Sequence, residues 1–200
     1  MTIPADATGR LVVVSGPSGA GKTTVLRRVF ERASVPLVAS VSATTRPPRP
    51  GEIDGVDYHF LSADEFHARR ERGEFLESFE VFGRGHWYGT LKSEVTTGLA
   101  AGKWVVLEID VQGALAVMDR RPDAISIFVR PGCVKELRRR LLHRGTETEE
   151  AIRPRLAQAD RELKLAGRYR YQVINDDLDR AVREICDILN QESEADRDAR

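Results

Sequence analysis

The residues with the clearest chemical meaning lie near the start of the chain. In a loop of the pattern G-x-x-x-x-G-K-[S/T], backbone N–H groups converge on phosphate oxygens at a helix N-terminus. The lysine adds a positive charge, and the final hydroxyl can ligate Mg²⁺. We therefore expect a site for a nucleoside triphosphate, with Lys22 as its cation and Thr23 as a Mg²⁺ ligand. The pattern is matched by Gly16, Pro17, Ser18, Gly19, Ala20, Gly21, Lys22 and Thr23.

A second group of candidates lies in the polar, Pro-rich segment 42–57 and just after it. Arg46 and Arg49 lie three residues apart, with the hydroxyl of Ser42 before them and that of Tyr58 after them. Guanidinium groups make paired hydrogen bonds to phosphate oxygens, and hydroxyls can complete the shell. The segment therefore suits a phosphate monoester.

Glu77 is the third candidate. It shares one parity of a strand-like alternation with Phe75, Phe79 and Val81, so its carboxylate lies on a mostly apolar face. A carboxylate in such a place is costly unless it has a partner.

The elements that must position these residues alternate along the chain. Strand-like apolar runs alternate with helical patterns, which predicts an α/β fold with a parallel sheet. Ligands of such sheets gather at the carboxyl edge of the strands, where the loop at 16–23 lies and where Glu108 and Asp110 end a strand. The expected strands are 11–14, 37–41, 58–61, 75–81, 104–110, 124–129 and 171–174, with a glycine-rich turn at 83–89. The expected helices are 23–33, 62–72, 91–101, 113–120, 134–143, a helix from 148 on and a last one from 178.

Composition narrows the class of protein. The chain has 200 residues, 41% of them apolar, which is enough for one compact domain with a sizeable core. The 31 basic and 31 acidic residues balance, which argues against a nucleic-acid binder, and no apolar run is long enough to span a membrane. Two cysteines give no disulfide framework, and four scattered histidines show no metal-ligand spacing. We expect a cytoplasmic protein. Residues 130–170 carry 12 basic and 6 acidic residues, so an anionic ligand can dock there.

The segment from Ser42 to Phe60 resembles guanylate kinases, which carry S-x-T-T-R-x-x-R-x-G-E-x-x-G-x-D-Y-x-F at this place. The resemblance spans about Val12 to Leu189. It continues through Glu77, Tyr88-Gly89-Thr90, Glu108-Ile109-Asp110-x-Gln112-Gly113, Arg140 and Arg144-Gly145-Thr146, Arg155 and Asn175-Asp176.

The resemblance implies a three-layer P-loop kinase fold with a central parallel sheet, formed by one guanylate-kinase-like domain over residues 1–200. Within it we expect a core of residues 10–41, 91–139 and 168–192, an inserted GMP-binding subdomain of residues 42–90 and a helical lid of residues 140–167. We expect residues 193–200 to be a disordered tail. The implied activity is an ATP:GMP phosphotransferase that gives ADP and GDP.

The resemblance also assigns roles to residues. Ser42, Arg46, Arg49, Tyr58 and Tyr88 would bind the phosphate of GMP, and Glu77, Thr90 and Asp110 its base. Guanine presents two adjacent donors that one carboxylate can accept, which adenine lacks at that edge. Asn175 would contact the adenine of ATP. The catalytic cations would be Lys22, Arg140, Arg144 and Arg155, together with Mg²⁺ held by Thr23 and by either Asp110 or Glu108.

Two other classes compete with this interpretation. Ribose bisphosphate kinases share the phosphate loop but lack the pattern of Tyr58 and Glu77. Guanylate-kinase-like scaffold domains have lost the intact loop, which Lys22 and Thr23 preserve here. The chain departs from the family in a longer stretch at 83–88 and in Pro154, which could kink the lid helix beside Arg155.

Overall fold

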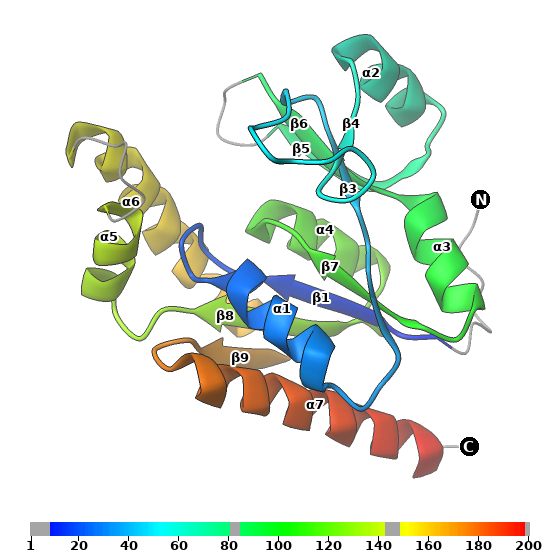
Figure 1. Cartoon of the computed structure of the whole chain (residues 1–200), viewed down its shortest axis with the longest axis vertical. Coiled ribbons are helices and arrows are strands. Elements are labelled where there is room, and N and C mark those ends of the chain that lie inside the picture. The colour runs from blue at the N-terminus through cyan, green and yellow to red at the C-terminus, as the bar shows by residue number, and fades with distance from the viewer. Residues whose placement is uncertain (1–8, 81–84, 143–148, 199–200) are drawn as a thin grey trace. The chain divides into compact units, whose positions relative to one another are not determined.

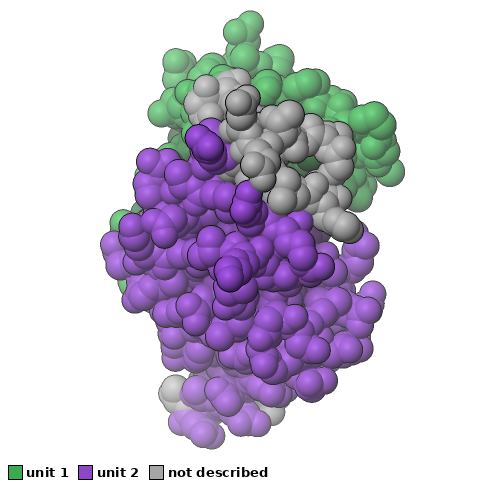
Figure 2. Space-filling model, turned by 90° about the vertical axis from the view of Figure 1, so that its left-hand side faces the viewer, with its two compact units in different colours: residues 1–13, 38–107, 112–124 green, residues 14–37, 108–111, 125–200 purple. Residues whose placement is uncertain are grey.

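The computed structural model describes residues 9–80, 85–142 and 149–198 (Figure 1). The chain divides into two compact units (Figure 2). Unit 1 comprises residues 1–13, 38–107 and 112–124, and unit 2 comprises residues 14–37, 108–111 and 125–200. Every helix in the described ranges is too short or too polar to cross a lipid bilayer.

A five-stranded sheet has the order β2-β7-β1-β8-β9, so β1 is its central strand. β1 (Leu11–Ser15) is buried along its whole length, as expected for a strand covered on both faces. β9 runs parallel to β8. The predicted α/β fold with a central parallel sheet is confirmed. The other strands are β2 (Leu37–Ala39), β7 (Trp104–Glu108), β8 (Ile125–Arg130) and β9 (Tyr171–Ile174).

The helices of unit 2 pack in two pairs. α1 and α7 pack together, and Arg28 on α1 forms a 3.0 Å ion pair with Asp179 on α7. α5 and α6 bury Leu137 and Ala159 between them. α6 continues through Pro154 without ending there. These helices are α1 (Lys22–Arg32), α5 (Val134–Leu142), α6 (Glu149–Leu163) and α7 (Leu178–Asp198), with a 3₁₀ turn at Ala166–Arg168.

Unit 1 contains a smaller sheet of order β4-β3-β6-β5. β6 pairs antiparallel with both β3 and β5, while β4 pairs parallel with β3. The Ser62 hydroxyl accepts from the Glu65 backbone N–H and so caps the start of α2. The strands are β3 (Ser42–Thr44), β4 (His59–Phe60), β5 (Phe75–Glu80) and β6 (Trp87–Leu91), and the helices are α2 (Ala63–Glu71), α3 (Lys92–Ala100) and α4 (Val111–Arg120).

The smaller sheet has its own aromatic core. Phe66 on α2 is fully buried and stacks on Phe75 of β5, with ring centroids 4.4 Å apart. Ala43 and Leu91 complete the cluster, and Trp87 packs against it. Stacked aromatic pairs contribute beyond the area they bury, so this core fixes α2 on the sheet that carries the second group of candidate residues.

Three expectations need correction. The turn at 83–89 was placed too far along the chain, because Trp87–Leu91 forms β6, where strands on both sides satisfy the backbone of Gly89. Residues 83–84 lie outside the described residues. Strand β3 occupies the first residues of the expected loop 42–57. The tail predicted to be disordered is helical as far as Asp198, because α7 continues through it.

We expect Phe66→Ala to lower the free energy of unfolding by about 3–5 kcal/mol, because it opens a cavity beside Phe75. Urea denaturation measures this loss. Ile53→Ala is the control, since Ile53 is 60% exposed and its truncation should change stability by less than about 0.5 kcal/mol. Equal losses in the two variants would contradict the packing described here.

Candidate active site

The glycine-rich loop at 16–23 joins β1 to α1, as predicted. Gly16, Gly19 and Gly21 adopt positive φ angles of 143°, 88° and 88°. A Cβ at Gly16 would overlap the carbonyl oxygen of Val129, so glycine is required there on steric grounds as well. Lys22 Nζ donates to the carbonyl oxygen of Gly16 at 2.6 Å, which holds the ammonium group over the loop.

Thr23 lies next to the end of β7. Its hydroxyl donates to Glu108 Oε1 at 2.6 Å. The sequence left Glu108 and Asp110 as alternatives, and the structure brings Glu108 onto Thr23. A hydroxyl and a carboxylate are the hard oxygen ligands that Mg²⁺ prefers, usually with one or two carboxylates and the substrate phosphates. Among the residues that the structure describes, no group of three or more His, Cys, Asp or Glu side chains is arranged to hold a metal ion.

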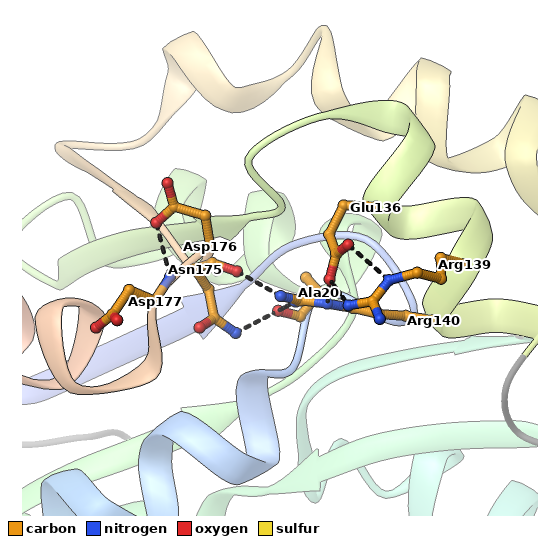
Figure 3. Close-up of polar contacts among 7 residues, drawn as sticks. All are labelled: Ala20, Glu136, Arg139, Arg140, Asn175, Asp176 and Asp177. Carbon is orange, nitrogen blue, oxygen red and sulfur yellow. Dashed lines mark hydrogen bonds and ion pairs between the residues drawn. The ribbon is translucent and has the colours of Figure 1, made fainter.

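Two of the predicted lid arginines contact the loop. Arg140 on α5 donates from Nη1 to the Ala20 carbonyl at 3.2 Å, and from Nη2 to the Asn175 carbonyl at 2.7 Å (Figure 3). Arg155 on α6 donates from Nη2 to the Ser18 hydroxyl at 2.9 Å. Arg144 lies outside the described residues. Unit 2 therefore gathers guanidinium groups at the phosphate loop, as expected for a site that receives a polyanion.

Asn175 follows β9 and is buried. Its side-chain Nδ2 donates to the Ala20 carbonyl at 2.8 Å (Figure 3). Its backbone N–H donates to the carbonyl of Arg130 at 2.8 Å. The resemblance implies an adenine contact here, which stays a prediction. The structure shows in addition that Asn175 ties the phosphate loop to the end of the sheet.

An acidic group that the sequence did not reveal lies near Lys22. Glu162 on α6 is only 8% exposed, and burial raises the pKa of its carboxyl, although Gln158 donates to it at 3.0 Å and Lys22 acts in the opposite direction. Burial also raises the pKa of Tyr169 to about 12. The negative charge of Asp110 contributes to both shifts. The sequence does not single out Glu162, because the regular apolar spacing of its helix is typical of a helix that packs against the protein core.

The second group of predicted residues lies in unit 1 and centres on Arg46. Its Nη1 and Nη2 donate to Oε2 and Oε1 of Glu52, both at 2.9 Å, and the guanidinium lies over the rings of Tyr58 and Phe60. This pairing raises the pKa of Arg46 and lowers that of Glu52. Glu52 also accepts from the backbone N–H of Arg49 at 2.7 Å. In the sequence Glu52 stands out only as one residue of the family motif. The structure shows that it holds the guanidinium of Arg46 and the backbone of Arg49.

Glu77 is buried on β5 and is 7% exposed, but it does not share a face with Phe75 as the alternation predicted. Phe75 lies opposite Leu91 and Glu77 lies opposite the adjacent Thr90, because the register shifts between them. The register aligns Ser42, Thr90 and Glu77 across β3, β6 and β5, and residues directly opposite share a face of the sheet. The Thr90 hydroxyl donates to Glu77 Oε1 at 2.7 Å. Tyr88, two residues before Thr90, lies with its ring 6.0 Å from that of Tyr58. Unit 1 therefore gathers a buried carboxylate, hydroxyls and a guanidinium on one small sheet.

Comparisons of the sequence and of the structure with known proteins lead to the same family. Residues 8–192 match the family model described as Guanylate kinase. The guanylate kinase of Rhodopirellula baltica is 58% identical over 184 residues, covering 90% of this chain and 87% of its own. That of Gloeobacter violaceus is 52% identical over 183 residues, covering 92% and 88%. The crystal structure of guanylate kinase from Anaplasma phagocytophilum superimposes with a TM-score of 0.75 at 34% identity, covering 92% of this chain and 86% of that one.

Gly21→Ala should weaken ATP binding, because a Cβ at Gly21 would lie 2.5 Å from Asn175 Nδ2 and displace the tie to Ala20. Gly73→Ala is the control, since Gly73 has a φ of 68° but nothing within 4 Å of its Cβ position. Both variants should lose about 1 kcal/mol of stability to the left-handed backbone. Titration calorimetry with ATP then separates them, and unchanged affinity in Gly21→Ala would refute the expectation.

Proposed function

Since the chain belongs to the guanylate kinase family, we infer that it transfers the γ-phosphoryl group of ATP to GMP and releases ADP and GDP. The observation that carries this inference is the buried carboxylate of Glu77 beside Thr90, in the same unit as the Arg46 cluster. Its geometry suits a guanine base, and the arginine suits the phosphate of the same nucleotide.

Glu77 is proposed to recognise guanine. An ionised carboxylate has about four acceptor positions, so the bond from Thr90 leaves capacity for two more donors. The guanine N1–H and exocyclic amine are two such donors side by side. AMP would leave the buried carboxylate without them, and polar sites reject such mismatches strongly. Thr90 and Asp110 are proposed as further contacts to the base.

The phosphate of GMP is proposed to bind at Arg46 and Arg49, with hydroxyls from Ser42, Tyr58 and Tyr88. Glu52 already occupies both terminal nitrogens of Arg46. Nη1 also donates to the Pro47 carbonyl at 2.7 Å, so the phosphate is proposed to accept from Nε and from the second N–H of Nη2, while Glu52 holds the plane of the guanidinium in place. The side chain of Arg49 is exposed and its backbone is fixed, which supports a direct role in capturing the anion.

ATP is proposed to bind at the loop 16–23, with Asn175 next to it. Lys22 would neutralise the β- and γ-phosphates. Thr23 and Glu108 would hold Mg²⁺, with Asp110 as a further candidate ligand, and the ion would supply positive charge to the phosphates. The hydroxyl and carboxylate found 2.6 Å apart support this assignment.

The reaction as proposed needs cations rather than a general base. The second pKa of a phosphate monoester is about 6, so the acceptor already carries a nucleophilic oxygen at neutral pH. The obstacle is repulsion between two polyanions and the charge that spreads over the transferred group. Lys22, Arg140 and Arg155 supply positive charge at the donor loop. Arg144 is proposed to join them.

The domain arrangement is proposed as predicted: residues 42–90 as the GMP-binding subdomain and 140–167 as a lid that closes over the nucleotides and excludes water. Leu137 on α5, just before the proposed lid, packs against Ala159 within it, so this contact joins the lid to the end of the core. We also propose a cytoplasmic location with no nucleic-acid partner, in keeping with the balanced charge and two unpaired cysteines.

The substrate is tested by a coupled assay of ADP release with GMP, AMP, UMP and ribose 1,5-bisphosphate as acceptors. We expect turnover of GMP to exceed that of the others by several orders of magnitude. Equal turnover of AMP would overturn the role of Glu77, and preference for the ribose bisphosphate would overturn the proposed function.

Glu77→Gln should reduce kcat/KM for GMP by at least about 100-fold, because an amide presents one donor where guanine needs only acceptors. Steady-state kinetics with GMP measure this. Glu80→Gln is the matched control: it makes the same change on the same strand at an exposed carboxylate that accepts from Gly85, and it should leave kcat/KM within twofold. A drop of the same size in both variants would point to damage to β5 instead.

Lys22→Ala should reduce kcat by at least about 1,000-fold and leave the affinity for GMP unchanged, because Lys22 serves the donor loop. Lys92→Ala is the control, since Lys92 Nζ likewise donates to a backbone carbonyl, that of Gly73 at 2.6 Å, but lies outside the proposed site. Calorimetry with GMP checks binding in both. Loss of GMP affinity in a folded Lys22→Ala protein would contradict the assignment.

A further inference from the structure

Glu136 on α5 binds two arginines at once (Figure 3). Arg139 donates to both of its oxygens, from Nε at 2.9 Å and from Nη2 at 2.8 Å. Arg140 donates from Nε to Glu136 Oε1 at 2.8 Å. These bonds lower the pKa of Glu136 to about 2, with Arg139 the larger cause and Arg140 the second. Glu136 is therefore ionised throughout the physiological range.

The bond to Glu136 uses only the Nε of Arg140. The terminal nitrogens Nη1 and Nη2 remain directed at the carbonyls of Ala20 and Asn175. The Ala20 carbonyl also accepts from the side chain of Asn175, so two donors from distant parts of the chain converge on one atom of the phosphate loop. Glu136 thus lies at the start of a continuous chain of hydrogen bonds that ends on the backbone of the proposed ATP site.

The bond from Arg140 to Glu136 restricts a long and flexible cationic side chain. An arginine side chain loses about 2 kcal/mol of rotamer entropy when it is fixed, and a fixed guanidinium acts on charge that develops only during the reaction. A carboxylate one helical turn earlier holds the Nε and so selects one orientation of the guanidinium plane. That carboxylate would also weaken the positive field, but Arg139 compensates its charge, and the three side chains together keep a net positive charge.

We propose that Glu136 is a positioning residue for phosphoryl transfer, which fixes Arg140 against the phosphate loop at Ala20 and leaves its terminal nitrogens directed at the donor site. This proposal rests on the catalytic role of Arg140 in the proposed function. Glu136 itself contacts neither nucleotide and acts only through Arg140.

The first test is Glu136→Gln, which removes the charge that holds the two arginines. We expect kcat to fall about tenfold or more, because small displacements of positioned groups have large effects on rate, while KM for GMP stays within twofold. The matched control is Glu65→Gln on α2, where Glu65 Oε1 accepts from Nε and Nη2 of Arg69 in the same i,i+4 arrangement, far along the chain from the phosphate loop. This control should leave kcat unchanged.

A double-mutant cycle with Arg140→Ala separates positioning from a purely structural role. If Glu136 acts through Arg140, the double variant should have the kcat of Arg140→Ala alone, within about twofold. A further tenfold loss in the double variant would overturn the proposal, because it would show an effect independent of Arg140. Glu136→Asp keeps the charge on a shorter side chain and should recover part of the lost kcat, and thermal unfolding shows that each variant is folded.

The outcomes distinguish this proposal from the proposed function. If the unaltered protein phosphorylates GMP and Glu136→Gln retains full kcat, only the role of Glu136 is overturned. Full kcat in Arg140→Ala overturns it as well, together with the role of Arg140. If the unaltered protein fails to phosphorylate GMP, the proposed function itself is overturned.

Discussion

The proposed site of unit 1 depends on the hydrogen bond that the Thr90 hydroxyl donates to Glu77. A buried carboxylate is stable only where donors are supplied. The register between β5 and β6 supplies one, and an irregularity between Phe75 and Glu77 allows the adjacent residues Phe75, Leu76 and Glu77 all to be buried. The same strand pair therefore builds the aromatic core on one face and holds the carboxylate of Glu77 beside hydroxyls on the other.

In unit 2 the side chains bonded to the loop at 16–23 are positively charged, in contrast to the carboxylate of Glu77 in unit 1. Its central strand ends in a loop whose backbone is shaped by glycines, and the side chains around that loop are mainly cations that bond to its own carbonyls and hydroxyl. Lys22, Arg140 and Arg155 are thus held in defined positions by groups of the protein itself. Preorganised charge costs little reorganisation during a reaction, which suits chemistry whose main obstacle is the repulsion of phosphates.

The sequence predicted most of the fold because its strands are continuous apolar runs and its helices carry clear periodicity. It also predicted the loop at 16–23 and the burial of Glu77. It was wrong for Trp87–Leu91, which forms a strand because strands flank it on both sides. It also did not reveal that Asn175, at the end of β9, donates to Ala20 in the loop. The orientation of Arg46 by Glu52 follows from the folding of one irregular segment, which no periodic pattern encodes.

Tyr171 and Arg170 both reach Glu192, whose side chain is only 4% exposed. Tyr171 is the first residue of β9, and Asn175 follows the last. The contacts of Glu192 therefore attach the end of α7 to the strand that leads to Asn175, which donates to Ala20. The carboxyl-terminal turns of the chain are thereby coupled to the nucleotide loop through a single strand. Sequence changes near residue 192, although remote from any proposed ligand contact, would alter how firmly that loop is held.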